Sequence, residues 1–184
     1  VPFSRALWIE GGGFMEVPSK GYRRLFPGNM ARLRYGYVVK CIGCDKDENG
    51  KIVAVHCEYL PETKSGTPGA DSVKVKGNLH WVSAAQSYAT EIRLYERLFK
   101  VPAPGSRREG DAPELERDFL GDLNPDSVQI ISAQLEPCLR EAGPEERFQF
   151  ERHGYFVADR VDSRPGAPVF NRAVTLKDSW GKAG

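Results

Sequence analysis

Alternating apolar and polar positions recur along most of this chain, in short runs separated by glycine and proline. Such runs predict half-buried β-strands, because successive side chains of a strand point to opposite faces. The pattern predicts strands at residues 6–10, 21–26, 32–44, 51–59, 73–76, 79–82, 91–99, 128–131, 134–139, 146–151, 154–159 and 169–176. The apolar positions of residues 91–99 fit a helical period as well, and the strand is favoured there. One helical turn is expected at residues 119–123. The chain is therefore expected to be all-β, built as a sandwich or as barrels.

Turn and loop signals divide this pattern. Asn49-Gly50 is the strongest hairpin signal, because both residues accept the positive φ that a tight turn needs. It predicts that Glu48 faces Lys51 and that Cys44 faces Val55. Residues 61–72 and 102–118 are polar and without periodicity, so they are expected to be loops that separate two lobes.

Charge changes this picture at one stretch. The 184 residues carry a net charge of +1, but residues 17–44 hold six cations and no acidic residue. The cations are Lys20, Arg23, Arg24, Arg32, Arg34 and Lys40, interleaved with the rings of Tyr22, Phe26, Tyr35 and Tyr37. Cations for phosphates and flat rings for bases are what a site for single-stranded nucleic acid needs. The alternative is a solvated edge strand whose cations discourage edge-to-edge pairing.

Two segments supply candidate contact residues. In an extended strand, Arg32 and Arg34 project side by side from one face, while Leu33 points to the core. In residues 148–152 the same alternation sets Gln149 apart from the flanking phenylalanines, and an amide together with the Arg152 guanidinium can read a base edge. The alternative for this second segment is a surface glutamine and a salt-bridged arginine.

No catalytic or metal-binding pattern is recognisable. The three histidines lie outside any catalytic motif, and the sequence has no nucleophile with a base in a known spacing. Cys41 and Cys44 form a lone C-x-x-C pair whose side chains point to opposite faces of the expected strand, so we expect no metal site. The cysteine pattern favours reduced thiols in a cytoplasmic protein, and no apolar run is long enough to span a membrane.

Colinear motifs along nearly the whole chain carry a family resemblance. They are Leu25-Phe26-Pro27-Gly28, Ala31-Arg32-Leu33-Arg34, Tyr37-Val38-Val39-Lys40-Cys41, residues 74–83, residues 91–99, residues 148–156, Pro168-Val169-Phe170-Asn171-Arg172 and Lys177-Asp178-Ser179-Trp180. With them the chain resembles the C-terminal anticodon-binding region of the bacterial glutaminyl-tRNA synthetases, which are class I ligases.

The resemblance implies a fold of two antiparallel β-barrels, the proximal one lacking its N-terminal strands. The implied division is residues 1–25 for part of the proximal barrel and a crossing, 26–100 for the distal barrel with its connection, and 101–184 for the return strands. It also implies RNA-binding roles. Arg32 and Arg34 would meet the first anticodon base and nearby phosphates, Arg23 and Arg24 the third base, and Gln149 with Arg152 the middle uracil.

The resemblance further implies partners. The RNA would be the anticodon stem-loop of glutamine tRNA, and a catalytic domain of the same parent chain would hold ATP and Mg²⁺, so this chain alone is expected to be non-catalytic, without a cofactor, and monomeric. Two alternatives stay open at this point: a glutamyl-type synthetase that shares these barrels, and a stand-alone β-barrel that binds ribosomal RNA.

Overall fold

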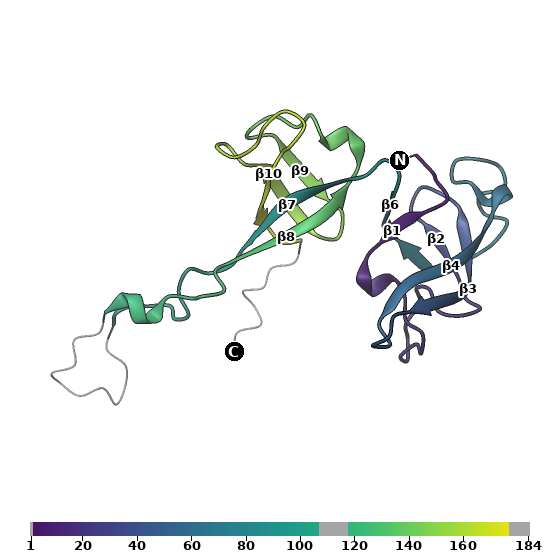
Figure 1. Cartoon of the computed structure of the whole chain (residues 1–184), viewed down its shortest axis with the longest axis horizontal. Helices are drawn as coiled ribbons and strands as arrows, with labels where there is room; N and C mark the ends of the chain where they lie inside the picture. The colour runs from purple at the N-terminus through teal and green to yellow at the C-terminus, as the bar shows by residue number, and fades with distance from the viewer. Residues whose placement is uncertain (1, 107–117, 177–184) are drawn as a thin grey trace. The chain divides into compact units, whose positions relative to one another are not determined.

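A computed structural model describes residues 2–106 and 118–176, and these residues form an all-β fold of two compact units, Val1–Ser87 and Tyr88–Gly184 (Figure 1). The helical segments in this part of the chain are single 3₁₀ turns, and none of them could cross a bilayer. The prediction of an all-β fold is confirmed. The three-segment division at residues 25/26 and 100/101 stays a prediction.

Unit 1 contains a four-stranded sheet and a two-stranded ribbon. The sheet has the order β4-β3-β2-β5, and β1 pairs with β6 in the ribbon. The bounds are β1 Leu7–Ile9, β2 Met30–Leu33, β3 Val38–Lys46, β4 Ile52–Leu60, β5 Gly77–Leu79 and β6 Trp81–Ser83. One core lies between them, formed by Phe14, Leu25, Ala31, Leu33, Val39, Cys41, Leu79 and Trp81. The alternation in β2 is as predicted, with Ala31 and Leu33 buried and Arg32 facing outward.

The single long strand predicted over residues 32–44 is wrong. A tight turn separates β2 from β3, with Tyr35 at φ 59° and a hydrogen bond of 2.7 Å from the Gly36 N–H to the Leu33 carbonyl. The sequence pattern does not predict this turn, because tyrosine disfavours positive φ and a single glycine, Gly36, is a weak turn signal. The extended piece predicted over residues 21–26 is likewise reduced to one bridge, between Leu25 and Phe14.

The predicted hairpin between β3 and β4 is confirmed, and Cys44 does lie opposite Val55. The turn itself differs, because the Asp47 N–H donates to the Lys51 carbonyl at 2.9 Å, which makes Asp47 rather than Glu48 the partner of Lys51. Gly50 then has φ 77°, as in a three-residue hairpin loop that ends in a bulge.

A second irregularity, around residue 42, corrects the prediction that Cys41 and Cys44 face opposite sides. The register shifts between Cys41 and Gly43, which interrupts the strict alternation, and both thiols pack on the same core of unit 1. All four cysteines of the chain are free thiols.

The strand predicted at residues 73–76 is wrong as well, because β5 begins at Gly77, the residue expected to end that strand. The lack of a side chain at Gly77 has a packing reason: a Cβ there would lie 2.1 Å from the Arg23 carbonyl oxygen. The strand predicted at residues 79–82 is interrupted at His80, where the chain leaves the sheet of β5 and enters the ribbon of β6.

Unit 2 is one five-stranded sheet of order β8-β7-β11-β10-β9. The bounds are β7 Tyr88–Tyr95, β8 Val128–Leu135, β9 Arg147–Phe150, β10 Gly154–Ala158 and β11 Phe170–Val174. These strands confirm those predicted at residues 91–99, 128–131, 146–151, 154–159 and 169–176, with shifted ends. The separate strand predicted at residues 134–139 is wrong, because β8 runs on to Leu135 and Pro137–Leu139 is a 3₁₀ turn. The turn expected at residues 119–123 is present as a 3₁₀ helix at Phe119–Asp122. Beneath the sheet Ile92, Phe156 and Phe170 are buried together, with Phe148 and Phe150 packed on them.

The prediction of purely antiparallel sheets is wrong at two places. β11 runs parallel to β7, and β2 runs parallel to β5. In both pairs the partners are far apart in the sequence, so a crossover rather than a hairpin joins them. The three sheets stay open in the described part of the chain.

β7 and β8 continue beyond the sheet as a narrow arm (Figure 1). Its two segments are held together by backbone hydrogen bonds, from the Glu96 N–H to the Ser127 carbonyl and from the Asn124 N–H to the Leu98 carbonyl, each 2.8 Å long. The 3₁₀ helix Phe119–Asp122 lies near the end of this arm, where the rings of Phe99 and Phe119 meet edge to face.

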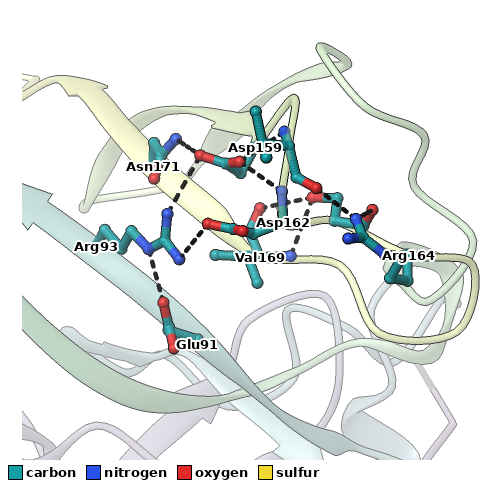
Figure 2. A network of polar contacts seen from close by, with 9 residues as sticks. Glu91, Arg93, Asp159, Asp162, Arg164, Val169 and Asn171 are labelled. Carbon is teal, nitrogen blue, oxygen red and sulfur yellow. Dashed lines mark hydrogen bonds and ion pairs between the residues drawn. The ribbon is translucent and has the colours of Figure 1, made fainter.

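A polar network around Arg93 ties the loop after β10 to β7 (Figure 2). The Arg93 guanidinium contacts Glu91 at 2.6 Å, Asp162 at 2.7 Å and Asp159 at 3.4 Å. Asp159 also accepts hydrogen bonds from the Val161 and Asp162 N–H groups and, at 2.6 Å, from the Asn171 amide. These hydrogen bonds, the backbone donor of Asp162 first, lower the pKa of Asp159.

We expect Gly77→Ala to destabilise unit 1 by about 1–3 kcal/mol, because the new methyl group would overlap the Arg23 carbonyl. Gly43→Ala is the matched control, since a Cβ at this second strand glycine meets nothing within 4 Å. Denaturant unfolding of both variants checks the expectation. Equal stability of the two would contradict the close approach at Gly77.

The Asp159 network predicts a pH dependence. Because the folded-state pKa of Asp159 is depressed, its stabilisation is complete above the ordinary carboxyl range and is lost as the pH falls through the depressed value. Asp159→Asn should lower the free energy of unfolding at pH 7 by about 1–3 kcal/mol. Unfolding curves should show this difference shrinking as the medium becomes strongly acidic, and a difference independent of pH would refute the charge-based explanation.

Candidate nucleic-acid interface

Arg23 and Arg24 lie in the segment that runs along β5. The Arg24 guanidinium donates to the Gly12 carbonyl at 3.0 Å and reaches Glu10 at 3.5 Å, and the Tyr22 hydroxyl donates to the same carbonyl at 2.9 Å. Arg24 is therefore partly held by the 3₁₀ turn Gly11–Gly13. Arg23 is exposed, and its side chain makes no hydrogen bond or ion pair with the described residues. Of these two adjacent cations, Arg23 is the one presented to solvent.

Arg32, by contrast, is engaged within unit 1. From β2 its guanidinium donates to the Thr63 carbonyl at 2.8 Å and to the Gly36 carbonyl at 3.4 Å, and it also donates to the Ala70 carbonyl. These contacts fasten the loop of residues 61–72 against the sheet. Arg32 therefore acts as a structural clamp within unit 1.

Arg34 occupies the turn after β2 rather than the strand, so it does not form the pair of neighbouring forks expected with Arg32. Its carbonyl accepts a hydrogen bond of 3.0 Å from the Trp81 indole, and its N–H donates to Leu79 at 2.9 Å. Its guanidinium carbon lies 4.9 Å from the centre of the Tyr35 ring, and the Tyr35 hydroxyl is 3.1 Å from Nη2. Tyr35 as a whole residue is 73% exposed.

Four aromatic rings gather beside this turn. Phe3 lies 4.9 Å from Tyr37, 5.4 Å from Tyr59 and 5.8 Å from Trp81, measured between ring centres. Sequence reasoning missed Phe3 and Tyr59 as members of this group, because they belong to an N-terminal segment and to β4, far from the basic stretch. No signal in the sequence alone could have joined them.

In unit 2, Gln149 stands on the solvent-facing side of β9, directly opposite Tyr155 of β10, while Phe148 and Phe150 pack inward. Arg152 follows in the turn between these strands, at φ 69°, and does not continue the alternation of β9. The chain therefore turns at residues 151–153, directly before β10. Tyr155 is a further candidate that sequence reasoning missed, although its alternation within β10 could have identified it.

The predicted site residues thus form two sets, one in each unit: Arg23, Arg24, Arg32 and Arg34 in unit 1, and Gln149 with Arg152 in unit 2. No group of potential metal ligands gathers in residues 2–106 and 118–176. Although Cys57 as a whole is exposed, desolvation of its thiol and the neighbouring Cys41 raise the pKa of Cys57 to about 12. A thiol in that state stays protonated and is a poor metal ligand.

Two family models match this chain. Both are described as the anticodon-binding domain of class I tRNA synthetases (E and Q), and they match residues 1–60 and 78–159, which together make up most of the chain. The chain belongs to this family. Its two anticodon-binding segments therefore carry both sets of residues described above, the arginines of residues 23–34 in the first and Gln149 with Arg152 in the second.

Curated relatives of this anticodon-binding region are named Glutamine–tRNA ligase. The chain is 66% identical over 181 residues to the one from Cupriavidus necator and 64% identical over 181 residues to the one from Ralstonia nicotianae. It is 60% identical over 179 residues to the one from Bordetella avium. The matches cover 98%, 98% and 97% of this chain but only 30%, 30% and 29% of the relatives. These relatives favour the glutaminyl interpretation over the glutamyl-type and ribosomal-RNA alternatives.

The contacts of Arg32 predict a structural cost for its replacement. Arg32→Lys should lower the free energy of unfolding by about 1–3 kcal/mol, because one ammonium group cannot reach the three carbonyls that the guanidinium fork serves. Arg23→Lys is the control, expected to change stability by less than about 0.5 kcal/mol as an exposed substitution. Denaturant titration compares them, and equal values for both variants would contradict the clamp.

Proposed function

We propose that this chain binds the anticodon loop of glutamine tRNA and reads its bases for a glutamine–tRNA ligase. Family membership and the names of the relatives support the proposal, and the acid-free run of cations in residues 17–44 supplies the physical means. The single observation that carries it is the two anticodon-binding family matches along one chain. Because the chain spans about 30% of its relatives' length, ligation itself is assigned to a region outside it.

Unit 1 would grip the loop mainly through charge. Arg23 is exposed and can approach a phosphate or the two acceptors on the edge of guanine, which suit a guanidinium fork. Arg24 is partly neutralised by Glu10, so binding would require it to exchange this partner for RNA. Arg32 would act chiefly by holding residues 61–72 in place beside the bound loop.

Unit 2 would contribute base reading. Gln149 offers both a donor and an acceptor from a rigid strand, and Tyr155 beside it offers a ring on which a base can lie. Arg152 in the adjoining turn supplies a positive charge. We assign this group to the middle uracil of the anticodon.

We also propose that the two units correspond to the distal and proximal anticodon-binding barrels. The support in unit 2 is β8, an edge strand whose Val128, Ile130 and Ile131 side chains are all exposed. An exposed apolar edge favours pairing with further strands, which a longer parent chain would supply. The same parent chain would hold ATP and Mg²⁺ in its catalytic domain and act as a monomer in the cytoplasm.

Binding to an anticodon stem-loop of glutamine tRNA tests the proposal. Changing the middle uracil should weaken binding by about 1–3 kcal/mol without altering the dependence on salt, because base edges rather than phosphates are read. Gln149→Ala should remove most of this discrimination. Fluorescence anisotropy at two salt concentrations measures both effects.

The matched control is Gln129→Ala, which removes an exposed glutamine from β8 of the same sheet and should leave discrimination unchanged. If the wild-type chain binds both RNAs equally, only phosphate contacts are made and base reading by this chain is refuted. If it binds neither RNA at low salt, the proposed function is refuted as a whole.

A further inference from the structure

Tyr35 adopts a backbone conformation that its residue type disfavours. Its φ of 59° lies in the left-handed region, which bulky side chains rarely occupy, and glycine, asparagine or aspartate would suit this position better. Its ring nonetheless contributes little to the core, because 73% of the residue is exposed. An exposed aromatic residue that keeps an unfavourable backbone conformation is a candidate for contact with a ligand outside the chain.

The surroundings of Tyr35 hold the turn rigidly. On one side of it the Leu33 N–H donates to the Tyr37 carbonyl at 2.8 Å, which closes the turn. Beneath it lies Trp81, whose indole binds the Arg34 carbonyl and whose ring would be only 3.3 Å from a Cβ at Gly36. The Phe3 ring packs edge to face on Trp81, with 5.8 Å between the ring centres. The backbone of the turn that carries Tyr35 is therefore held by contacts within unit 1.

Arg34 places a positive charge next to the Tyr35 ring. Its guanidinium lies over the ring at 4.9 Å, and the contact of 3.1 Å between Nη2 and the Tyr35 hydroxyl fixes their mutual orientation. A flat ring beside a flat cation offers π surface for a base together with a positive charge for the adjoining phosphate. The run of residues 17–44 to which both belong contains no carboxylate.

We propose that Tyr35, paired with Arg34, is a stacking platform for one unpaired base of the bound RNA loop. This inference rests on the proposed function and adds to it a residue that binds by stacking rather than by reading a base edge. The platform accepts any base, because every base has a π face. It therefore contributes affinity and positions the loop, while discrimination among bases stays with Gln149 and the arginines.

Replacement of the ring tests the platform. Tyr35→Asn removes the ring but suits positive φ, so the variant should fold at least as stably as wild type. It should bind the glutamine anticodon stem-loop at least about fivefold more weakly, with an unchanged salt slope. A 2-aminopurine placed in turn at each loop position should be quenched on binding at one position by the wild type, and not by Tyr35→Asn.

Two control variants accompany it. Tyr35→Phe keeps the ring and should retain both the affinity within about twofold and the quenching, since stacking needs no hydroxyl. Tyr95→Thr removes an exposed tyrosine of β7 in unit 2 and should behave as wild type.

The outcomes separate this inference from the function on which it rests. If the wild type binds the stem-loop and Tyr35→Asn binds it equally with the same quenching, the platform is refuted while RNA binding stands. If Tyr35→Asn weakens binding only by reducing the salt slope, the residue serves the Arg34 phosphate contact, and stacking is again refuted. If the wild type does not bind the RNA, both proposals fail.

Discussion

The hydrogen bond from the Trp81 indole to the Arg34 carbonyl connects two features on which unit 1 depends. One is the turn that separates β2 from β3, and the other is the junction where the chain passes from β5 to β6. A buried indole N–H without an acceptor would cost about 1–3 kcal/mol, so the turn and the junction stabilise each other. Tyr35 lies in this turn, and Gly36 beside it accepts hydrogen bonds from Ser65 of the loop that Arg32 holds.

The cations of residues 17–44 form one cluster in the sequence but serve different purposes in the fold. Arg32 is engaged by backbone carbonyls, Arg24 is shared between a carbonyl and a carboxylate, Arg34 is paired with a ring, and Arg23 is exposed. An internally bound guanidinium still contributes positive potential at the surface. Its removal, however, changes the fold as well as the charge, so loss of RNA binding by such a variant has two physical sources.

Much of the fold could be predicted, because strict alternation marks half-buried strands such as β2 and β10 and because Asn49-Gly50 specifies a hairpin locally. The failures have local or long-range physical causes. Tyr35 has positive φ in a turn whose Arg34 is bonded to Trp81 and Leu79, which are distant in the sequence. At Gly77 a side chain would overlap the Arg23 carbonyl, so glycine there belongs to a strand and does not end one. The parallel pairing of β11 with β7 joins segments about eighty residues apart, and the local pattern of apolar positions cannot predict such a pairing.

The residues of the candidate site could be predicted from the sequence, but their contacts could not. Its arginines and Gln149 could be named from charge and alternation. The engagement of Arg32 by residues 61–72 depends on tertiary structure, as does the aromatic group that includes Phe3 and Tyr59.

The strand order of unit 2 has a consequence for how the chain is made. β11, the last of the described strands to leave a ribosome, is also the central strand of its sheet, between β7 and β10. Until it emerges, β7 with β8 and β9 with β10 are separate two-stranded ribbons, which are marginally stable in water. Unit 1 has all of its strands once Ser83 is synthesised. During translation unit 1 can therefore fold early, whereas unit 2 exposes unpaired edges until nearly its whole length is synthesised.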